Sequence, residues 1–172
     1  MFRKSLYLVC ILLGFMLIGK ADSSSFKKVS ENKYILENEY LEIELNSTAG
    51  GLGNIIYKPQ NISLTGVSIN TSERTSFEDR IYQQTRTEQD RIINVEYFSR
   101  YPYSIKVLKD TGKEVSIEVS SKSFSDIFPG LIVSKVYTLK ENVPALFVEH
   151  RLENTSDTPI KAGLWSTNFF RV

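Results

Sequence analysis

The strand-like segment from Ala145 to Asn154 carries the only histidine of the chain, and charged residues flank that histidine on both sides. Side chains alternate between the two faces of a strand, so His150 shares a face with Leu146, Val148 and Leu152. One interpretation is a packed, hydrogen-bonded histidine, because buried polar groups find partners. The other is a catalytic histidine that acts as a general acid or base.

The opposite face of the same segment holds Glu149, Arg151 and Glu153, with Phe147 among them. Alternating charge on an antiparallel strand is typical of a solvated face. The alternative is a concave sheet face that binds hydroxyl groups through charged side chains backed by an aromatic ring. On that interpretation Glu149 and Arg151 are the first ligand-binding candidates.

The aromatic residues of the second half offer a further candidate surface. Trp165 is the only tryptophan; its ring can stack on a sugar, or it can anchor a core. A tyrosine-rich stretch also has two interpretations: it can line a groove, or it can form the inner face of an edge strand bent by Pro102. That stretch contains Tyr97, Phe98, Tyr101 and Tyr103.

Several chemistries lack the residues that they need. There is no His or Cys cluster for a transition metal, no spaced acidic loop for calcium and no Gly-x-Ser-x-Gly nucleophile motif, so we expect no metal and no cofactor. The formal net charge is +1, and the basic residues are scattered among acidic ones. A nucleic-acid partner is therefore not expected, since binding phosphates requires a basic surface.

The N-terminus predicts export. Two basic residues precede the apolar run from Leu6 to Gly19, and small residues follow, which is the order of a secretory signal peptide covering residues 1–21. The run is shorter than a membrane-spanning helix requires, so we expect cleavage without a stable membrane anchor, and a secreted or periplasmic protein. The only cysteine, Cys10, lies in this run, so the fold must be held by a core and not by disulfides. Residues 22–32 read as a flexible leader and residues 33–172 as one domain.

Short strands separated by turn residues fill most of that domain. Period-two alternation predicts a half-buried strand at Leu41–Leu45, and Gly112 marks the turn of a hairpin that joins Tyr103–Leu108 to Glu114–Ser120. A second pair joins Leu131–Leu139 to Ala145–Asn154, and a further strand reaches Trp165. This spacing predicts an all-β fold, an antiparallel β-sandwich.

Two segments are expected to lie outside strands. Ala49–Asn54 is rich in glycine and predicts a tight turn between strands. Ser76–Asp90 is polar and lacks period two, which predicts a short helix or a long connection over one edge or end of the sandwich.

Two segments resemble a known family. ENKYILENEYLEIELNSTAGGLGNIIYK resembles the opening of galactose mutarotase-like domains, and VSKVYTLKENVPALFVEHRLENTSDTPIKAGLW resembles their middle. The resemblance implies a β-supersandwich of which this chain is the front part, incomplete at its C-terminus. In mutarotases a histidine protonates the ring oxygen of the sugar, which makes His150 the catalytic candidate by resemblance.

We therefore expect a domain that binds or processes carbohydrate, as the front part of a glycoside hydrolase, polysaccharide lyase or aldose epimerase. The candidate binding residues are Glu149, Arg151 and Trp165. The alternative is a noncatalytic structural or adhesion module of immunoglobulin-like type, for which charged strands and tyrosines need no sugar.

Overall fold

The protein is built almost entirely of antiparallel strands. The computed structural model describes residues 7–9, 23–47, 51–65, 77–86 and 91–168. No α-helix occurs among these residues; two single-turn 3-10 helices, η1 (Lys58–Gln60) and η2 (Phe98–Arg100), interrupt the strands. None of the described segments forms a helix long and apolar enough to cross a membrane.

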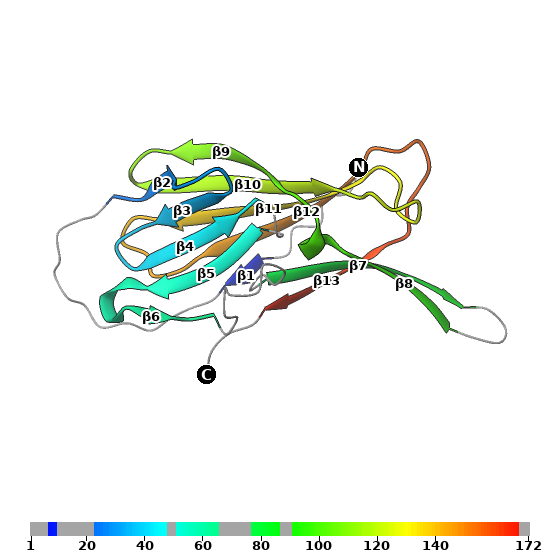
Figure 1. Ribbon diagram of the computed structural model, residues 1–172, viewed down its shortest axis with the longest axis horizontal. Helices are drawn as coiled ribbons and strands as arrows, with labels where there is room; N and C mark the ends of the chain where they lie inside the picture. Colours follow the sequence, from blue (N-terminus) through cyan, green and yellow to red (C-terminus); the bar gives the residue numbers. More distant parts are fainter. Residues whose placement is uncertain (1–6, 10–22, 48–50, 66–76, 87–90, 169–172) are drawn as a thin grey trace.

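Two five-stranded sheets and one three-stranded sheet make up the fold (Figure 1). The first sheet has the order β1-β12-β11-β10-β9, with β1 (Tyr7–Val9), β12 (Phe147–Asn154), β11 (Leu131–Lys140), β10 (Glu114–Lys122) and β9 (Ser104–Asp110). The second has the order β2-β3-β4-β5-β6, with β2 (Ser25–Lys28), β3 (Lys33–Glu37), β4 (Leu41–Asn46), β5 (Gly51–Tyr57) and β6 (Ile62–Ser63). The third has the order β13-β7-β8, with β13 (Gly163–Asn168), β7 (Phe77–Arg86) and β8 (Arg91–Tyr97).

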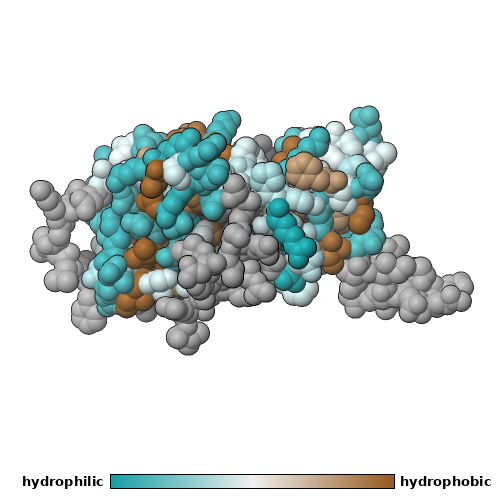
Figure 2. All heavy atoms as spheres, viewed as in Figure 1, coloured by the Kyte–Doolittle hydropathy of each residue, from teal (hydrophilic) through white to brown (hydrophobic). Residues whose placement is uncertain are grey.

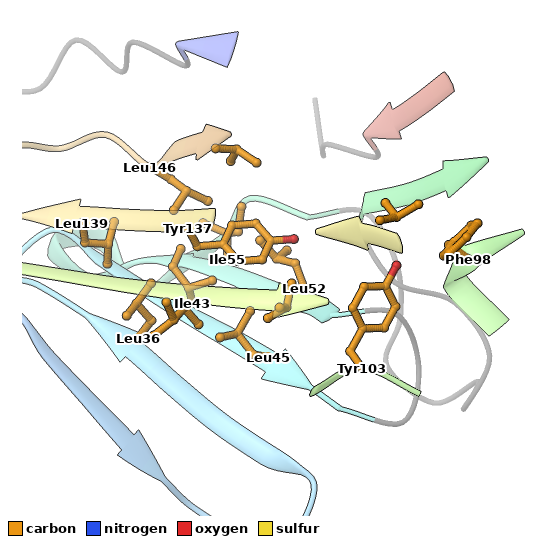
Figure 3. Close-up of a cluster of buried hydrophobic side chains, with 14 of the residues drawn as sticks. Leu36, Ile43, Leu45, Leu52, Ile55, Phe98, Tyr103, Tyr137, Leu139 and Leu146 are labelled. Atoms are coloured by element: carbon orange, nitrogen blue, oxygen red, sulfur yellow. The ribbon is translucent and has the colours of Figure 1, made fainter. Parts of the chain in front are cut away.

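The core lies between the two five-stranded sheets. Alternate residues of β4 are buried, and so are alternate residues along β11, as expected for strands with one face in a core. Leu36, Ile43 and Leu45 from the second sheet meet Tyr137 and Leu139 from the first in one apolar cluster (Figure 3). Each fully buried aliphatic side chain of this kind contributes about 1.5–3 kcal/mol. The all-β sandwich expected from the sequence is confirmed.

Both predicted strand pairs are present. β9 pairs with β10, and β11 pairs with β12 in a continuous register. Gly112 in the first hairpin has φ +75°, a conformation that a residue without a Cβ adopts without strain. β2 lies within the segment expected to be a flexible leader. β1 lies within the expected signal peptide, most of which falls outside the described residues.

Two local predictions are wrong. In the segment Ala49–Asn54 that was expected to be a turn, Ala49 and Gly50 lie outside the described residues, and Gly51–Asn54 belongs to β5, which pairs with β4 with a register irregularity between Ile43 and Leu45. The segment expected to be a helix or a long connection contains β7, Phe77–Arg86, the central strand of the three-stranded sheet. Its inward positions include a charged residue, Asp79, so the apolar alternation typical of a half-buried strand is broken.

The surface is mostly hydrophilic, with separate apolar patches between polar areas on the face that Figure 2 shows. β9 is an edge strand that is exposed along most of its length, including Val107 and Leu108. A register shift interrupts its pairing with β10, and Lys106 and Lys109 flank these apolar residues. Bulges and lysines of this kind oppose pairing with other strands.

Candidate functional site

The outer face of the three-stranded sheet carries a row of aromatic and cationic side chains. The strand register places Trp165 of β13 opposite Arg80 of β7, and Arg80 opposite Tyr97 of β8. The Arg80 guanidinium carbon lies 5.5 Å from the Trp165 ring centroid and 4.9 Å from the Tyr97 ring centroid. Trp165 is 59% exposed, so one of these rings is open to solvent.

The next row on the same face adds another ring. Tyr82 pairs with Gly163 on one side and with Val95 on the other. A Cβ at Gly163 would lie 2.4 Å from the Tyr82 ring, so that ring lies against the glycine backbone and only a residue without a side chain leaves space for it. This ring is therefore next to the row that contains Trp165.

A second guanidinium comes from η2. Arg100 is exposed and its guanidinium carbon lies 4.9 Å from the Tyr97 ring centroid. We call this surface the aromatic–arginine platform, defined by the side chains of Trp165, Tyr82, Arg80, Tyr97 and Arg100.

Buried groups fix η2 and hence the backbone at Arg100. Phe98 is fully buried, and the neighbouring Glu96 is 4% exposed on the inner face of β8. The Ser123 hydroxyl donates to the Glu96 carboxylate, at 2.9 Å from Oε1 and 2.8 Å from Oε2, which ties β8 to the loop after β10. Burial, with the nearby Glu96 carboxylate, raises the pKa of Tyr101 to about 12. The residues on either side of Arg100 are thus held by the body of the protein.

The inner face of β7 takes part in a buried charge cluster. Asp79 and Lys135 are both 0% exposed, and Lys135 Nζ lies 2.6 Å from Asp79 Oδ2. His150 pairs directly with Lys135 across β11 and β12, and its Nε2 lies 3.4 Å from Asp79 Oδ1. One carboxylate from the three-stranded sheet therefore lies between the side-chain nitrogens of Lys135 and His150, both from the first sheet.

Two tyrosines surround the ammonium group of this cluster. Lys135 Nζ lies 5.5 Å from the Tyr103 ring centroid and 5.9 Å from that of Tyr137; Tyr137 lies in the middle of the apolar cluster and Tyr103 on its side towards Phe98 (Figure 3). Burial would raise the pKa of Asp79, but the Lys135 charge and His150 outweigh it and lower that pKa. Burial would likewise lower the pKa of Lys135, but the Asp79 carboxylate raises it. Both members of the pair are therefore charged in the folded protein.

This pair predicts a specific dependence of stability on pH. A carboxyl whose folded pKa is lowered contributes stability above its unfolded pKa, here 3.8, and loses it as the pH falls towards the folded pKa. As the pH falls below the unfolded pKa of 3.8, the free energy of unfolding should decrease by up to about 1.4 kcal/mol per pH unit from Asp79 alone. Denaturant unfolding from about pH 7 to about pH 2 measures it. The Asp79→Asn variant should lack this component, and an identical acid slope in both proteins would contradict the prediction.

The structure separates the residues that the sequence proposed together. His150 is packed against Asp79, with a side chain that is 10% exposed. Arg151 lies on the outer face of the first sheet, where its guanidinium binds Glu149 at 3.0 and 3.2 Å and Glu118 at 3.1 Å. Trp165 lies on another sheet and is exposed, so its alternative interpretation as a core residue is wrong.

The sequence did not reveal the residues that contact His150 and Trp165, namely Asp79 beside His150 and Arg80 beside Trp165. The signal for Lys135 was present, because the other alternate positions of β11, at Val133, Tyr137 and Leu139, are apolar. A lysine in such a phase needs a buried counter-charge. The platform had no comparable signal, because Arg80 falls in the segment that was not expected to be a strand.

The described residues contain no group of three or more His, Cys, Asp or Glu side chains that could hold a metal ion. No protein-family model matches the chain, and no curated protein sequence matches it either. The geometry of the two faces of β7 is therefore the basis for a functional proposal.

Proposed function

We propose that this protein is a carbohydrate-binding domain and that the aromatic–arginine platform is its binding surface. The observation that carries the proposal is Trp165, a large ring that is 59% exposed on a sheet face that also carries Tyr82 and Tyr97. An exposed tryptophan ring adds little to the core of this fold, whereas a ligand with an apolar ring face gains a stacking partner from it.

The platform suits a sugar for a second reason. Aromatic rings offer apolar area to the C–H face of a pyranose, while guanidinium groups donate several hydrogen bonds to its hydroxyl oxygens. The exposed Arg100 lies against Tyr97, on the same surface as the exposed Trp165 ring, so both kinds of contact are present on one surface. The neighbouring strands hold these side chains in register, which reduces the ordering cost on binding.

Binding, and not catalysis, is the role that we assign to the platform. The catalytic candidate His150 lies on the inner side of β7 with Asp79, whereas the platform is on the outer side. The galactose mutarotase-like resemblance and export through residues 1–21 belong to this proposal. A carbohydrate-binding surface is consistent with both.

Replacing Trp165 with alanine should weaken binding to the preferred glycan by at least about tenfold, which corresponds to about 1.4 kcal/mol. The reason is the loss of the exposed stacking surface, without a cavity in the core. Affinity electrophoresis against a panel of neutral and acidic polysaccharides identifies the ligand. Calorimetric titration with oligosaccharides of that glycan then gives the affinity.

Phe124→Ala is the matched control, since Phe124 is an aromatic residue with 70% exposure. Its backbone N–H donates to Glu96, on the side of β8 opposite to Tyr97, so this variant should bind as the wild type does. Equal loss of affinity in both variants would contradict the platform. A wild-type chain that binds no glycan of the panel would favour the structural or adhesion module.

A further inference from the structure

Arg80 lies between two rings of the platform and is held by the protein itself. We infer that Arg80 is a positioning residue: its guanidinium fixes the Trp165 ring in the orientation that a sugar meets, and it does not contact the ligand. The inference rests on the proposed carbohydrate binding. It assigns the stacking contact to Trp165, the polar contacts to Arg100 and the support of the stacking ring to Arg80.

The guanidinium of Arg80 is in contact range of both rings. β7 is the central strand of the three-stranded sheet, so Arg80 has Trp165 of β13 on one side and Tyr97 of β8 on the other. Its guanidinium carbon lies 5.5 Å from the Trp165 ring centroid and 4.9 Å from that of Tyr97, within the range of about 6 Å in which a ring attracts a cation. One side chain therefore connects the two rings.

Arg80 is itself firmly held. Its side chain is half-buried, its Nε is buried, and it makes a further interaction within the protein. The residues on either side of it, Asp79 and Ile81, are both fully buried on the inner face of β7. The backbone and the side chain of Arg80 are therefore both fixed, which a residue that supports another side chain requires.

The position of Trp165 explains why its ring needs a support. The ring is 59% exposed and belongs to β13, an edge strand of the three-stranded sheet. Gly163, the preceding residue on the same face of β13, has no side chain to pack against the ring. An exposed side chain exchanges between staggered rotamers within nanoseconds. The contact with Arg80 therefore limits the motion of the Trp165 ring before any ligand binds.

A ring that is fixed in advance binds a sugar more tightly. A sugar that stacks on a mobile indole must order that side chain, and this ordering reduces the affinity. With Arg80 in place, the Trp165 ring is ordered when the protein folds. Arg80 therefore contributes to affinity through Trp165, although its own guanidinium is already engaged within the protein.

The first measurement is the motion of the ring in the ligand-free protein. Trp165 is the only tryptophan of the chain, so the tryptophan fluorescence reports on this ring alone. Time-resolved fluorescence anisotropy of the full-length chain separates nanosecond motion of the ring from tumbling of the whole protein. Arg80→Met removes the cation and leaves an unbranched side chain. This variant should show a larger fast component of the anisotropy decay than the wild type.

The second measurement is the affinity for a glycan. Affinity gels that contain hydroxyethyl cellulose, xylan or pectin show which of these polysaccharides retards the wild type most, and its oligosaccharides are then titrated calorimetrically. Arg80→Met should lose about two- to tenfold in affinity, the effect of having to order one side chain on binding. Loss of a direct contact between Arg80 and the sugar would lower the affinity without changing the motion of Trp165 in the ligand-free protein.

Two further variants separate the causes. Arg80→Lys keeps the charge but not the planar group that stacks on rings, so the Trp165 ring should again move faster and the glycan should again bind more weakly. Because it retains the charge and most of the aliphatic stem, Arg80→Lys also provides the test if Arg80→Met does not fold. Lys106→Met removes an exposed charge from β9, on another sheet, and should match the wild type in both measurements.

The outcomes separate this inference from the proposal on which it rests. Unchanged Trp165 motion in both Arg80 variants would overturn the inference, and so would faster motion with unchanged affinity. In either case carbohydrate binding stands if Trp165→Ala still abolishes retention by the glycan. Equal effects in Lys106→Met would assign the result to net charge and would overturn the inference as well. If no glycan retards the wild type, the proposed function fails, and the role of Arg80 fails with it.

Discussion

Replacing Lys135 with methionine is expected to reduce the free energy of unfolding by about 3–5 kcal/mol, because it leaves the Asp79 carboxylate buried without its counter-charge. Both side chains are 0% exposed and their charged atoms are 2.6 Å apart. Water cannot replace the lost ammonium group at such a position. Urea unfolding at neutral pH, followed by tryptophan fluorescence and circular dichroism, measures the change.

The double variant Asp79→Leu with Lys135→Met tests the cause. It removes both charges and fills the same space with apolar groups, so it should be at least about 2 kcal/mol more stable than the Lys135→Met variant. Lys122→Met is the control, since this lysine is exposed at the end of β10 and its loss should change stability by no more than about 0.5 kcal/mol. A double variant as unstable as the single one would mean that lost packing, and not the unpaired charge, causes the destabilisation.

The Asp79–Lys135 pair explains why the sequence predicts β4 and β11 but not β7. In β4 and β11 the period-two pattern is strong enough to predict the strands, because most of their inward positions are apolar. In β7 the inward Asp79 lies beside Ile81, and its burial depends on a lysine that is distant in the sequence. The alternation of apolar and polar residues therefore cannot predict β7, because Asp79 is buried only through its ion pair with Lys135, which is distant in the sequence.

The candidate site shows the same limit. Trp165 could be identified from its type alone, but its exposure follows from the pairing of β13 with β7, two strands separated by most of the domain. Arg80 and Tyr97 become its neighbours only through that pairing and that of β7 with β8. Glu149 and Arg151 are adjacent on one strand and were accessible to sequence reasoning, yet they lie on a different sheet.

The side chain of Asn38 connects the two large sheets. It is fully buried in the turn between β3 and β4. Its Nδ2 donates to the carbonyl oxygens of Lys140 and Val143, at 2.8 and 3.0 Å, and thereby reaches the β11–β12 connection. Its Oδ1 accepts from the backbone N–H groups of Tyr40 and Leu41, at 2.9 and 2.8 Å. Both the nitrogen and the oxygen of the Asn38 side-chain amide are therefore hydrogen-bonded to backbone groups.

Asn38→Ala should therefore reduce the free energy of unfolding by about 2–5 kcal/mol, because four backbone groups lose a partner at a buried position. Asn38→Asp keeps the acceptor for the two N–H groups but turns a carboxylate oxygen towards two carbonyl oxygens. It should also be destabilised, and more at neutral pH than in acid, where the carboxyl can donate. Asn32→Ala is the control: this exposed asparagine accepts one hydrogen bond from Ser47, at 3.2 Å, and its loss should cost less than about 1 kcal/mol. If denaturant unfolding gives the same value for Asn38→Ala and Asn32→Ala, the two sheets are held together by the apolar core and this amide contributes little.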